Sequence, residues 1–215
     1  MRKIILIGGG GHCRSVIDVI EQQGIYEIAG IVDVTSKIGT TVLGYKVIAT
    51  DKELPLLAKE YKEFCVTIGH TVNRSLRKDI YLLLNGLNVK LPVVKSPHAY
   101  VATTASIKTG SVIMHHSIIN ANARLGESTI ANTGCIIEHD VEIGNHCHIG
   151  PGSVLNGGCK IEDDCFIGSN SVLLPGTIMQ KNSIVAAGSV IRGPVEENSM
   201  YAGNPGELKK IKRNG

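Results

Sequence analysis

The sequence has no tryptophan and little other aromatic content, with six tyrosines and two phenylalanines in 215 residues. Its net charge of only +3 excludes the basic surface, interleaved with aromatics, that nucleic-acid binding favours. No run approaches the roughly 18 apolar residues of a membrane span. The opening MRKIILIGGGGH reaches glycines after too short an apolar run for a signal peptide. We therefore expect a cytoplasmic protein without nucleic-acid or membrane partners, whose six cysteines are thiols.

A period of six residues dominates the chain from His98 to Gly193. Sixteen hexads follow one another without a break, from HAYVAT and TASIKT to NSIVAA and GSVIRG. Position four is Val, Ile, Leu or Met in fifteen of them, with Ala131 as the exception, and position two is small apart from Val141. This pattern predicts a parallel β-helix with three hexads per coil, in which residues 18 apart stack at about 4.8 Å.

Positions two and four are expected to fill the interior of this β-helix. Four cysteines fall on position two, and we interpret them as small core residues rather than ligands or nucleophiles: Cys135, Cys147, Cys159 and Cys165. The other four positions are predicted to face outward. That makes His139, Asp140, His146 and His148 surface-directed.

Short apolar segments alternate with amphipathic ones before the repeat begins. We expect strands at residues 3–7, 26–33 and 64–69, and helices at residues 13–24 and 72–86, which together indicate a small parallel α/β sheet. Ligands of such sheets bind at the carboxyl ends of the strands. This places Gly8 to His12, Asp33 and Gly69–His70 around one crevice.

The glycine run GGGGH suits a phosphate bound by bare backbone at the N-terminus of a helix. It does not match the dinucleotide fingerprint G-x-G-x-x-G, since Cys13 or Arg14 occupies the third glycine, and no Walker Lys-Ser/Thr follows. Nucleotide-sugar phosphate binding, a tight structural turn and dinucleotide binding therefore remain as alternatives. His12 either contacts a ligand phosphate or caps its own helix.

The motif IGGGGH, a continuous hexapeptide repeat carrying IEHD, and the ending YAGNPGELKKI together resemble one known family. It comprises the bacterial nucleotide-sugar acyltransferases related to the sialic acid O-acetyltransferases. Its best understood members N-acetylate UDP-, dTDP- or GDP-linked 4-amino-4,6-dideoxy sugars. The resemblance implies a left-handed β-helix, a homotrimer with active sites between subunits, and acetyl-CoA as the donor. We assign residues 1–95 to a Rossmann-like nucleotide-sugar-binding domain, 96–193 to the β-helix and 194–215 to a tail.

The resemblance also implies roles for particular residues. The family's catalytic histidine falls on His139, an acidic neighbour that raises its basicity on Asp140, and a histidine that contacts acetyl-CoA on His148. The contacts to the nucleotide sugar fall on Gly10, Gly11, His12, Asp33, Val34 and Gly69.

The predicted coil geometry adds further expectations. Gly157 lies 18 residues after His139, so it leaves space above the imidazole and a backbone N–H for a thioester oxyanion. His148 lies half a coil away, so a site shared by the two histidines requires two chains. On the face of His148, position six gives a column of small side chains along which a pantetheine arm fits, and we assign Ser169 and Ala187 to it with Pro151.

These residues predict direct acetyl transfer in a ternary complex, with His139 as the general base. A sialic acid hydroxyl is the alternative acceptor, and a non-catalytic nucleotide-sugar-binding protein is the second alternative. A zinc enzyme built on His146 and His148 is disfavoured, because the trimeric β-helix carbonic anhydrases space a histidine pair five apart; we expect no metal. The remaining histidines and the basic C-terminal side chains are interpreted as solvated surface: His70, His98, His115, His116, Lys209, Lys210, Lys212 and Arg213.

Overall fold

The computed structural model describes residues 1–69 and 75–211, so His70, Lys212 and Arg213 lie outside the described residues. The chain divides into two compact units, Met1–Pro97 and His98–Gly215, which are described separately. Among the described residues, no helix combines the length and apolar composition needed to cross a bilayer.

The first unit is a five-stranded sheet with the strand order β3-β4-β2-β1-β5. The pairs β1–β2, β1–β5 and β2–β4 are parallel, whereas β3–β4 is an antiparallel hairpin. The five strands are β1 (Arg2–Ile7), β2 (Tyr26–Val32), β3 (Thr41–Val42), β4 (Tyr45–Ala49) and β5 (Glu63–Val66), and the helices are α1 (Gly11–Gln23), α2 (Leu54–Glu60) and α3 (Ser75–Gly86). A further short strand, β6 (Val94–Lys95), lies outside this sheet. This confirms the expected parallel α/β unit. The hairpin and α2 were not predicted.

Helix α1 positions the glycine run and is encoded by its own sequence. Its buried side chains recur at helical spacing, and Gly24 ends it in a left-handed conformation with its N–H bonded to the Ile20 carbonyl. The helix begins directly after Gly10, at the carboxyl end of β1. Its first turn, whose N–H groups have no partners within the helix, therefore opens at the ligand-binding edge of the sheet.

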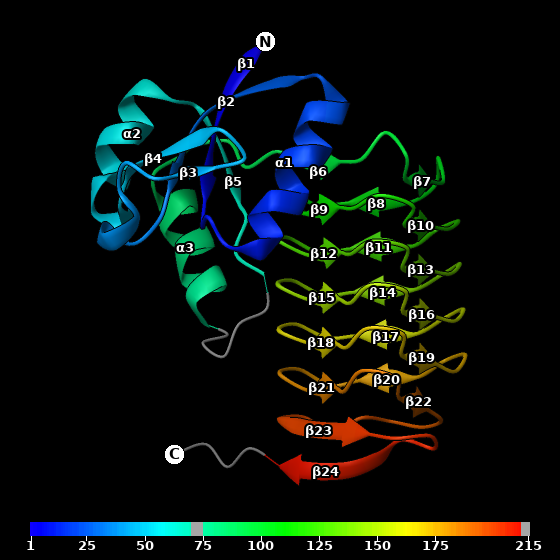
Figure 1. Cartoon of the computed structure of the whole chain (residues 1–215). Coiled ribbons are helices and arrows are strands. Elements are labelled where there is room, and N and C mark those ends of the chain that lie inside the picture. The colour runs from blue at the N-terminus through cyan, green and yellow to red at the C-terminus, as the bar shows by residue number, and fades with distance from the viewer. Residues whose placement is uncertain (70–74, 212–215) are drawn as a thin grey trace. The chain divides into compact units, whose positions relative to one another are not determined.

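The second unit is the left-handed β-helix that the hexads predict, and Figure 1 shows its coils stacked in sequence order. Every hexad supplies one two-residue strand, and strands 18 residues apart pair in parallel. The first face consists of β7 (Tyr100–Val101), β10 (Ile118–Ile119), β13 (Ile136–Ile137), β16 (Val154–Leu155), β19 (Val172–Leu173) and β22 (Val190–Ile191). The second face consists of β8 (Ser106–Ile107), β11 (Arg124–Leu125), β14 (Glu142–Ile143), β17 (Lys160–Ile161) and β20 (Ile178–Met179). The third face contains β9 (Val112–Ile113), β12 (Ile130–Ala131), β15 (His148–Ile149), β18 (Phe166–Ile167) and β21 (Ile184–Val185).

The interior is filled as the repeat predicts. From the third hexad onward, every side chain at positions two and four is buried, including all four cysteines of the repeat. The corners depend on position one, which has a positive φ in fourteen successive hexads, from Gly110 to Gly188. Gly, Asn, Asp and His dominate this position because they tolerate a left-handed backbone better than other residues. A turn is therefore set every six residues.

The residues expected to form a C-terminal tail partly continue the β-helix. Strand β23 (Ser199–Ala202) pairs in parallel with β21, and β24 (Glu207–Ile211) pairs antiparallel with β23. Strand β24 is exposed along its whole length, with Lys209 and Lys210 on it. Lys209 forms an ion pair with Glu207 at 3.0 Å.

Candidate active site

His139 and Asp140 lie at the corner between the first and second faces, immediately after β13. Asp140 has a φ of 59°, and its N–H donates to the Ala121 carbonyl at 3.0 Å, so the corner of the previous coil holds this residue. Both side chains reach solvent, with exposed fractions of 65% for His139 and 58% for Asp140. His139 is therefore surface-directed, as expected.

Asp140 orients the imidazole of His139. Its Oδ2 lies 2.9 Å from His139 Nδ1, and its Oδ1 accepts a hydrogen bond from Asn122 Nδ2 at 3.3 Å. These two contacts, the histidine first, lower the pKa of the Asp140 carboxyl. A carboxylate only accepts, so Nδ1 carries the proton of a neutral imidazole and Nε2 keeps its lone pair. This arrangement leaves Nε2 able to accept a proton.

Gly157 lies over the free side of the imidazole, as the 18-residue spacing predicts. A Cβ at this position would lie 2.6 Å from both Cε1 and Nε2 of His139, closer than real Cβ contacts come. Among the described residues, the Gly157 N–H has no backbone acceptor, whereas its carbonyl accepts from Gly176. The missing side chain thus makes room for the His139 imidazole and leaves a backbone donor near the atom that would accept a proton.

His148 is buried although position three points away from the core, so the expectation that it lies on the surface was wrong. It is 8% exposed and lies edge-on to Phe166, with the ring centroids 5.4 Å apart. Its Nε2 lies 3.0 Å from Asn132 Nδ2. Its stacked neighbours on the third face are Ile130 and Phe166. Its neighbour His146 is half-buried at another corner.

The column expected to bind pantetheine forms the corner between the third and first faces. Here Pro151 and Ala187 are exposed and Ser169 is half-buried. Successive coils are joined by bonds from Asn170 N–H to the Pro151 carbonyl at 2.9 Å and from Gly188 N–H to the Ser169 carbonyl at 2.8 Å. The first face therefore has His139 at one edge and this small-residue column at the other.

The first face itself carries an apolar column at position three, where the polar side chains of a solvated sheet would be expected. Its members pair strand to strand and are exposed or half-buried: Tyr100, Ile118, Ile136, Val154, Val172 and Val190. This column was not predicted, although every eighteenth residue from Tyr100 onward is apolar. Contiguous exposed apolar surface of this kind indicates a protein interface.

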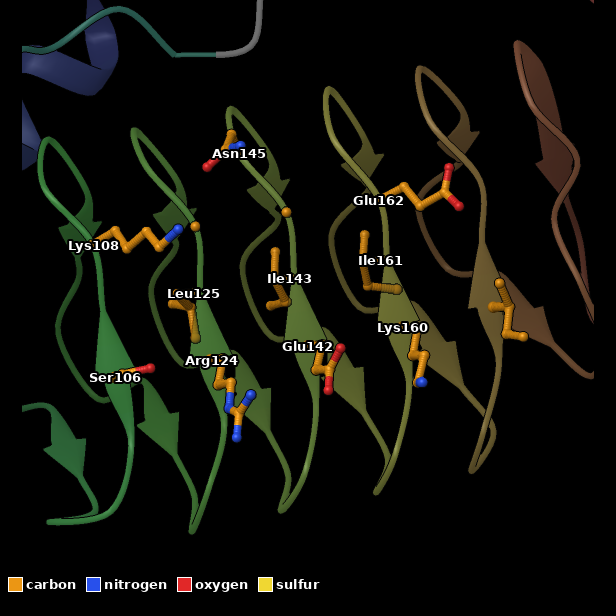
Figure 2. A pocket seen from close by; sticks show the side chains of 13 residues that line it. Ser106, Lys108, Arg124, Leu125, Glu142, Ile143, Asn145, Lys160, Ile161 and Glu162 are labelled. Atoms are coloured by element: carbon orange, nitrogen blue, oxygen red, sulfur yellow. The ribbon is translucent and has the colours of Figure 1, made fainter.

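The second face differs from the first because charged side chains of both signs lie on successive coils (Figure 2). An open groove of about 690 Å³ runs along it, lined by Arg124, Glu142 and Lys160 among others. This mixture of charges is typical of a solvated surface, and we assign no substrate to it.

In the first unit, all six residues expected to contact the nucleotide sugar line one cavity of about 330 Å³: Gly10, Gly11, His12, Asp33, Val34 and Gly69. The four glycines of the run have different tasks. Gly8 has a φ of 100°, and a Cβ on Gly9 would lie 2.9 Å from Asp33 Oδ2, so these two are required by the fold. Nothing lies within 4 Å of a Cβ built on Gly10 or Gly11. Their bare backbone is therefore open to a ligand.

Asp33 is held firmly at the end of β2. Its Oδ2 accepts from Gly9 N–H at 2.7 Å and from Lys37 Nζ at 2.8 Å, and its Oδ1 accepts from Val34 N–H at 2.7 Å. Burial alone would raise the pKa of Asp33, but these hydrogen bonds and the lysine charge lower it overall. Asp33 is consequently an ionised group whose two oxygens are already engaged.

His12 is half-buried in the first turn of α1, against Gly69. Burial, followed by the nearby Arg77 charge, lowers its pKa to about 4. It is therefore neutral near pH 7 in the ligand-free protein. Gly10, and not His12, is the N-cap of α1, and it makes no side-chain bond.

The structure also adds Lys37 and Asp51 to this cavity, and sequence reasoning missed both. Asp51 follows β4, which was not predicted. The short stretch at residues 45–49, shortly before Asp51, carried a signal for this strand in its apolar residues.

Among the other histidines, His98 and His116 are exposed as expected and His115 is half-buried. The three rings form a cluster with centroids 5.7–6.4 Å apart.

Comparison with known proteins agrees with both units. A profile for the PglD N-terminal domain matches residues 3–82, and one for bacterial transferase hexapeptide repeats matches residues 122–157 and 158–193. An uncharacterized protein of Acanthamoeba polyphaga mimivirus is 31% identical over 127 residues, which are 59% of this chain and 24% of that protein. The chain thus spans about a quarter of the length of that relative.

Solved structures match over almost the entire chain. A variant of perosamine N-acetyltransferase from Caulobacter crescentus, in complex with CoA and GDP-perosamine, is 29% identical with a TM-score of 0.91, covering 98% of each chain. The acetyltransferase domain of PglB from Neisseria gonorrhoeae, in complex with acetyl coenzyme A, is 30% identical with a TM-score of 0.88, covering 97% of this chain and 99% of that chain. WeeI from Acinetobacter baumannii is 25% identical with a TM-score of 0.85, covering 97% of this chain and 100% of that chain. The chain belongs to the family of nucleotide-sugar N-acetyltransferases that join a PglD N-terminal domain to a hexapeptide-repeat β-helix.

Proposed function

We propose that this enzyme transfers an acetyl group from acetyl-CoA to the 4-amino group of a nucleotide-linked 4-amino-4,6-dideoxy sugar. The observation that carries the proposal is the His139–Asp140 pair, in which a carboxylate holds Nδ1 at 2.9 Å and the ring with its Nε2 packs against Gly157, where there is no side chain. This geometry suits a base that accepts a proton from an attacking nitrogen. The similarity to proteins bound to CoA, acetyl-CoA and GDP-perosamine supports the choice of donor and acceptor.

In the proposed reaction, the sugar nitrogen attacks the carbonyl carbon of the acetyl thioester in a ternary complex. The new carbon–nitrogen bond forms and His139 Nε2 accepts the proton that the nitrogen loses. The carbon–sulfur bond then breaks, CoA leaves as a thiolate, and the imidazolium returns that proton to the sulfur. Asp140 stabilises the imidazolium that results. The Gly157 N–H donates to the oxyanion of the tetrahedral intermediate, a contribution of roughly 3–4 kcal/mol for donors of this kind. No acyl-enzyme is required, since the cysteines of the repeat are buried.

The site is proposed to form between copies in a homotrimer. Because the first face has an exposed apolar column and lies between the His139 corner and the Ser169–Ala187 corner, three copies with this face turned inward bury the column. Around such an axis, the His139 corner of one copy approaches the small-residue column of the next. The pantetheine arm then lies along Ser169 and Ala187 of the neighbouring copy and brings its thioester toward His139.

The buried position of His148 changes the role that we propose for it. Because His148 is 8% exposed and its Nε2 lies against Asn132, we propose that it forms part of the wall of the acetyl-CoA site rather than presenting a free nitrogen to the thioester.

The nucleotide of the acceptor is proposed to bind in the cavity of the first unit, with its diphosphate on the open backbone of Gly10 and Gly11. A cytoplasmic location completes the proposal.

The test is an acetyl-transfer assay with acetyl-CoA and a panel of acceptors, following CoA release together with the mass of the product. We expect turnover with at least one of the UDP-, dTDP- or GDP-linked 4-amino-4,6-dideoxy sugars, and none with the corresponding 4-hydroxy sugars. Turnover of sialic acid without turnover of any amino sugar would replace amine transfer by O-acetylation. Tight binding of the amino sugars without any acetyl transfer would identify a binding protein.

A further inference from the structure

Asp51 is an uncommitted carboxylate in the nucleotide cavity. It begins the 3₁₀ turn Asp51–Glu53 directly after Thr50, at the carboxyl end of β4, and it lines the same cavity as the glycine run. Across the described parts of the chain, its carboxylate has no hydrogen bond and no ion pair. Asp33, the other acid of the cavity, has both oxygens engaged by Gly9, Val34 and Lys37. Asp51 is thus the acid that remains available to a ligand.

The strand order tells which part of a nucleotide reaches Asp51. The carboxyl ends that border the cavity follow one another as β4, β2, β1 and β5. A diphosphate belongs at the end of β1, where α1 begins, and in sheets of this type the nucleoside extends from there across the end of the neighbouring strand. Here that direction runs past Asp33 and Val34 to Asp51. The base therefore arrives at the end of β4.

Two further side chains suit a base in this position. Val34 is 58% exposed although it is aliphatic, so it offers an apolar surface for the flat face of a nucleobase. Lys37 also lines the cavity and can donate from its ammonium group to a carbonyl of the base. A flat apolar contact, a cation and a free carboxylate are thus available at one end of the cavity.

The chemistry of the bases decides which of them the carboxylate accepts. Guanine presents two adjacent donors, N1–H and the N2 amino group, which match the two oxygens of a carboxylate in a bidentate pair. Uracil and thymine present one N–H flanked by two carbonyl oxygens, which a carboxylate repels. Adenine and cytosine present an amino group beside a ring nitrogen that only accepts. We propose that Asp51 selects guanine, so that the acceptor is a GDP-linked amino sugar; this rests on the proposed function.

The electrostatics of the cavity agree with this assignment. Burial, followed by the charge of Asp33, raises the pKa of the Asp51 carboxyl, so its ionised form is poorly compensated when the cavity is empty. Two N–H donors from guanine would stabilise that ionised form. A carbonyl oxygen in the same place would add a repulsive contact, which discriminates against the wrong base as effectively as attraction favours the right one.

The test is calorimetric binding of GDP, IDP, UDP and dTDP to the full-length protein, which requires no acetyl transfer. We expect GDP to bind about tenfold or more tighter than UDP and dTDP. IDP lacks the N2 amino group and should bind about tenfold more weakly than GDP. The inference is overturned if UDP or dTDP binds the wild-type protein as tightly as GDP does.

The variant Asp51→Asn tests the residue itself. An amide presents one acceptor and one donor, so it should weaken GDP binding about tenfold or more and strengthen UDP and dTDP binding, and it should remove the difference between GDP and IDP. Asp79→Asn, on the exposed surface of α3 and outside the cavity, is the matched control and should change nothing. An unchanged preference for GDP in Asp51→Asn would refute the assignment. If that variant does not fold, the comparison of the four nucleotides on the wild-type protein decides alone.

The nucleotide-binding result and the acetyl-transfer result can be told apart, so the assignment of Asp51 and the proposed function can fail separately. Selective GDP binding without acetyl transfer to any amino sugar would leave the assignment of Asp51 standing and end the proposed reaction. Acetyl transfer to UDP- or dTDP-linked sugars, with no preference for GDP, would leave the proposed reaction standing and end the assignment of Asp51.

Discussion

Replacing Gly157 by alanine tests whether catalysis needs the His139 imidazole in its present position against Gly157. The added methyl carbon would lie 2.6 Å from Cε1 and Nε2 of the imidazole, about 1 Å closer than an ordinary contact. The φ of Gly157 is not in the left-handed region, so the alanine backbone is unstrained, and His139 is exposed enough to swing away. The free energy of unfolding should therefore change by no more than about 0.5 kcal/mol. The ring, however, must leave the position set by Asp140.

A displacement of about 1 Å at a reacting group lowers kcat by about a hundredfold. We expect this loss in Gly157→Ala, measured by steady-state kinetics with saturating acetyl-CoA and amino sugar, while the affinity for the nucleotide stays unchanged. Gly193→Ala is the matched control, because Gly193 lies in the same column 36 residues further on, with open space around a Cβ and no positive φ. A Gly157→Ala enzyme with wild-type kcat would refute the reasoning that the imidazole works in this space.

Three further predictions concern other parts of the account. Asp140→Asn should lower kcat about tenfold or more with little change in KM for acetyl-CoA, because the amide does not hold His139 as a proton acceptor; an unchanged kcat would contradict the pairing. The pKa of His12 is lowered from 6.5 to about 4, so the unfolded chain binds a proton between these values and the folded chain does not. The free energy of unfolding should fall by up to about 3 kcal/mol as the pH drops from 6.5 to 4, and His12→Gln should flatten this dependence in pH-dependent denaturation; equal slopes would count against it. Val154→Asp should dissociate the trimer in light-scattering measurements, whereas Lys160→Asp on the second face should not, and a trimeric Val154→Asp protein would exclude the first face as the interface.

The β-helix was predictable because its signal is local and repeated. Each hexad specifies two inward side chains, so the register is fixed many times over, and the position of Gly157 above His139 followed from counting 18 residues. The left-handed conformation at position one was also encoded, in the Gly, Asn, Asp and His residues that recur there.

The burial of His148 was not predictable from the period alone. Position three faces away from the core on every face, but each face gives it different neighbours. His148, between Ile130 and Phe166 in its column, is buried, whereas Glu142, between Arg124 and Lys160, is in solvent. Reading the sequence at intervals of 18, in addition to 6, would have indicated which column is apolar.

In the first unit, the cavity residues that follow the three expected strands were found, and Lys37 and Asp51 were missed. Asp33 followed a clear strand, and the glycine run preceded a clear helix. The position of Asp51 depends on β4, which follows the hairpin turn and pairs with β2. The position of the Lys37 side chain depends on its ion pair with Asp33, which exists only in the folded chain. Side-chain pairing between segments this far apart in sequence requires the tertiary structure.

The central claim is that His139 removes the proton from the amine during acetyl transfer. The most direct measurement is kcat for His139→Ala, with acetyl-CoA and the amino sugar that the wild-type enzyme uses, on protein whose oligomeric state and nucleotide affinity are unchanged. The account predicts a loss of about a hundredfold or more. A variant that retains kcat within about threefold of the wild type would show that the chemistry takes place without this imidazole.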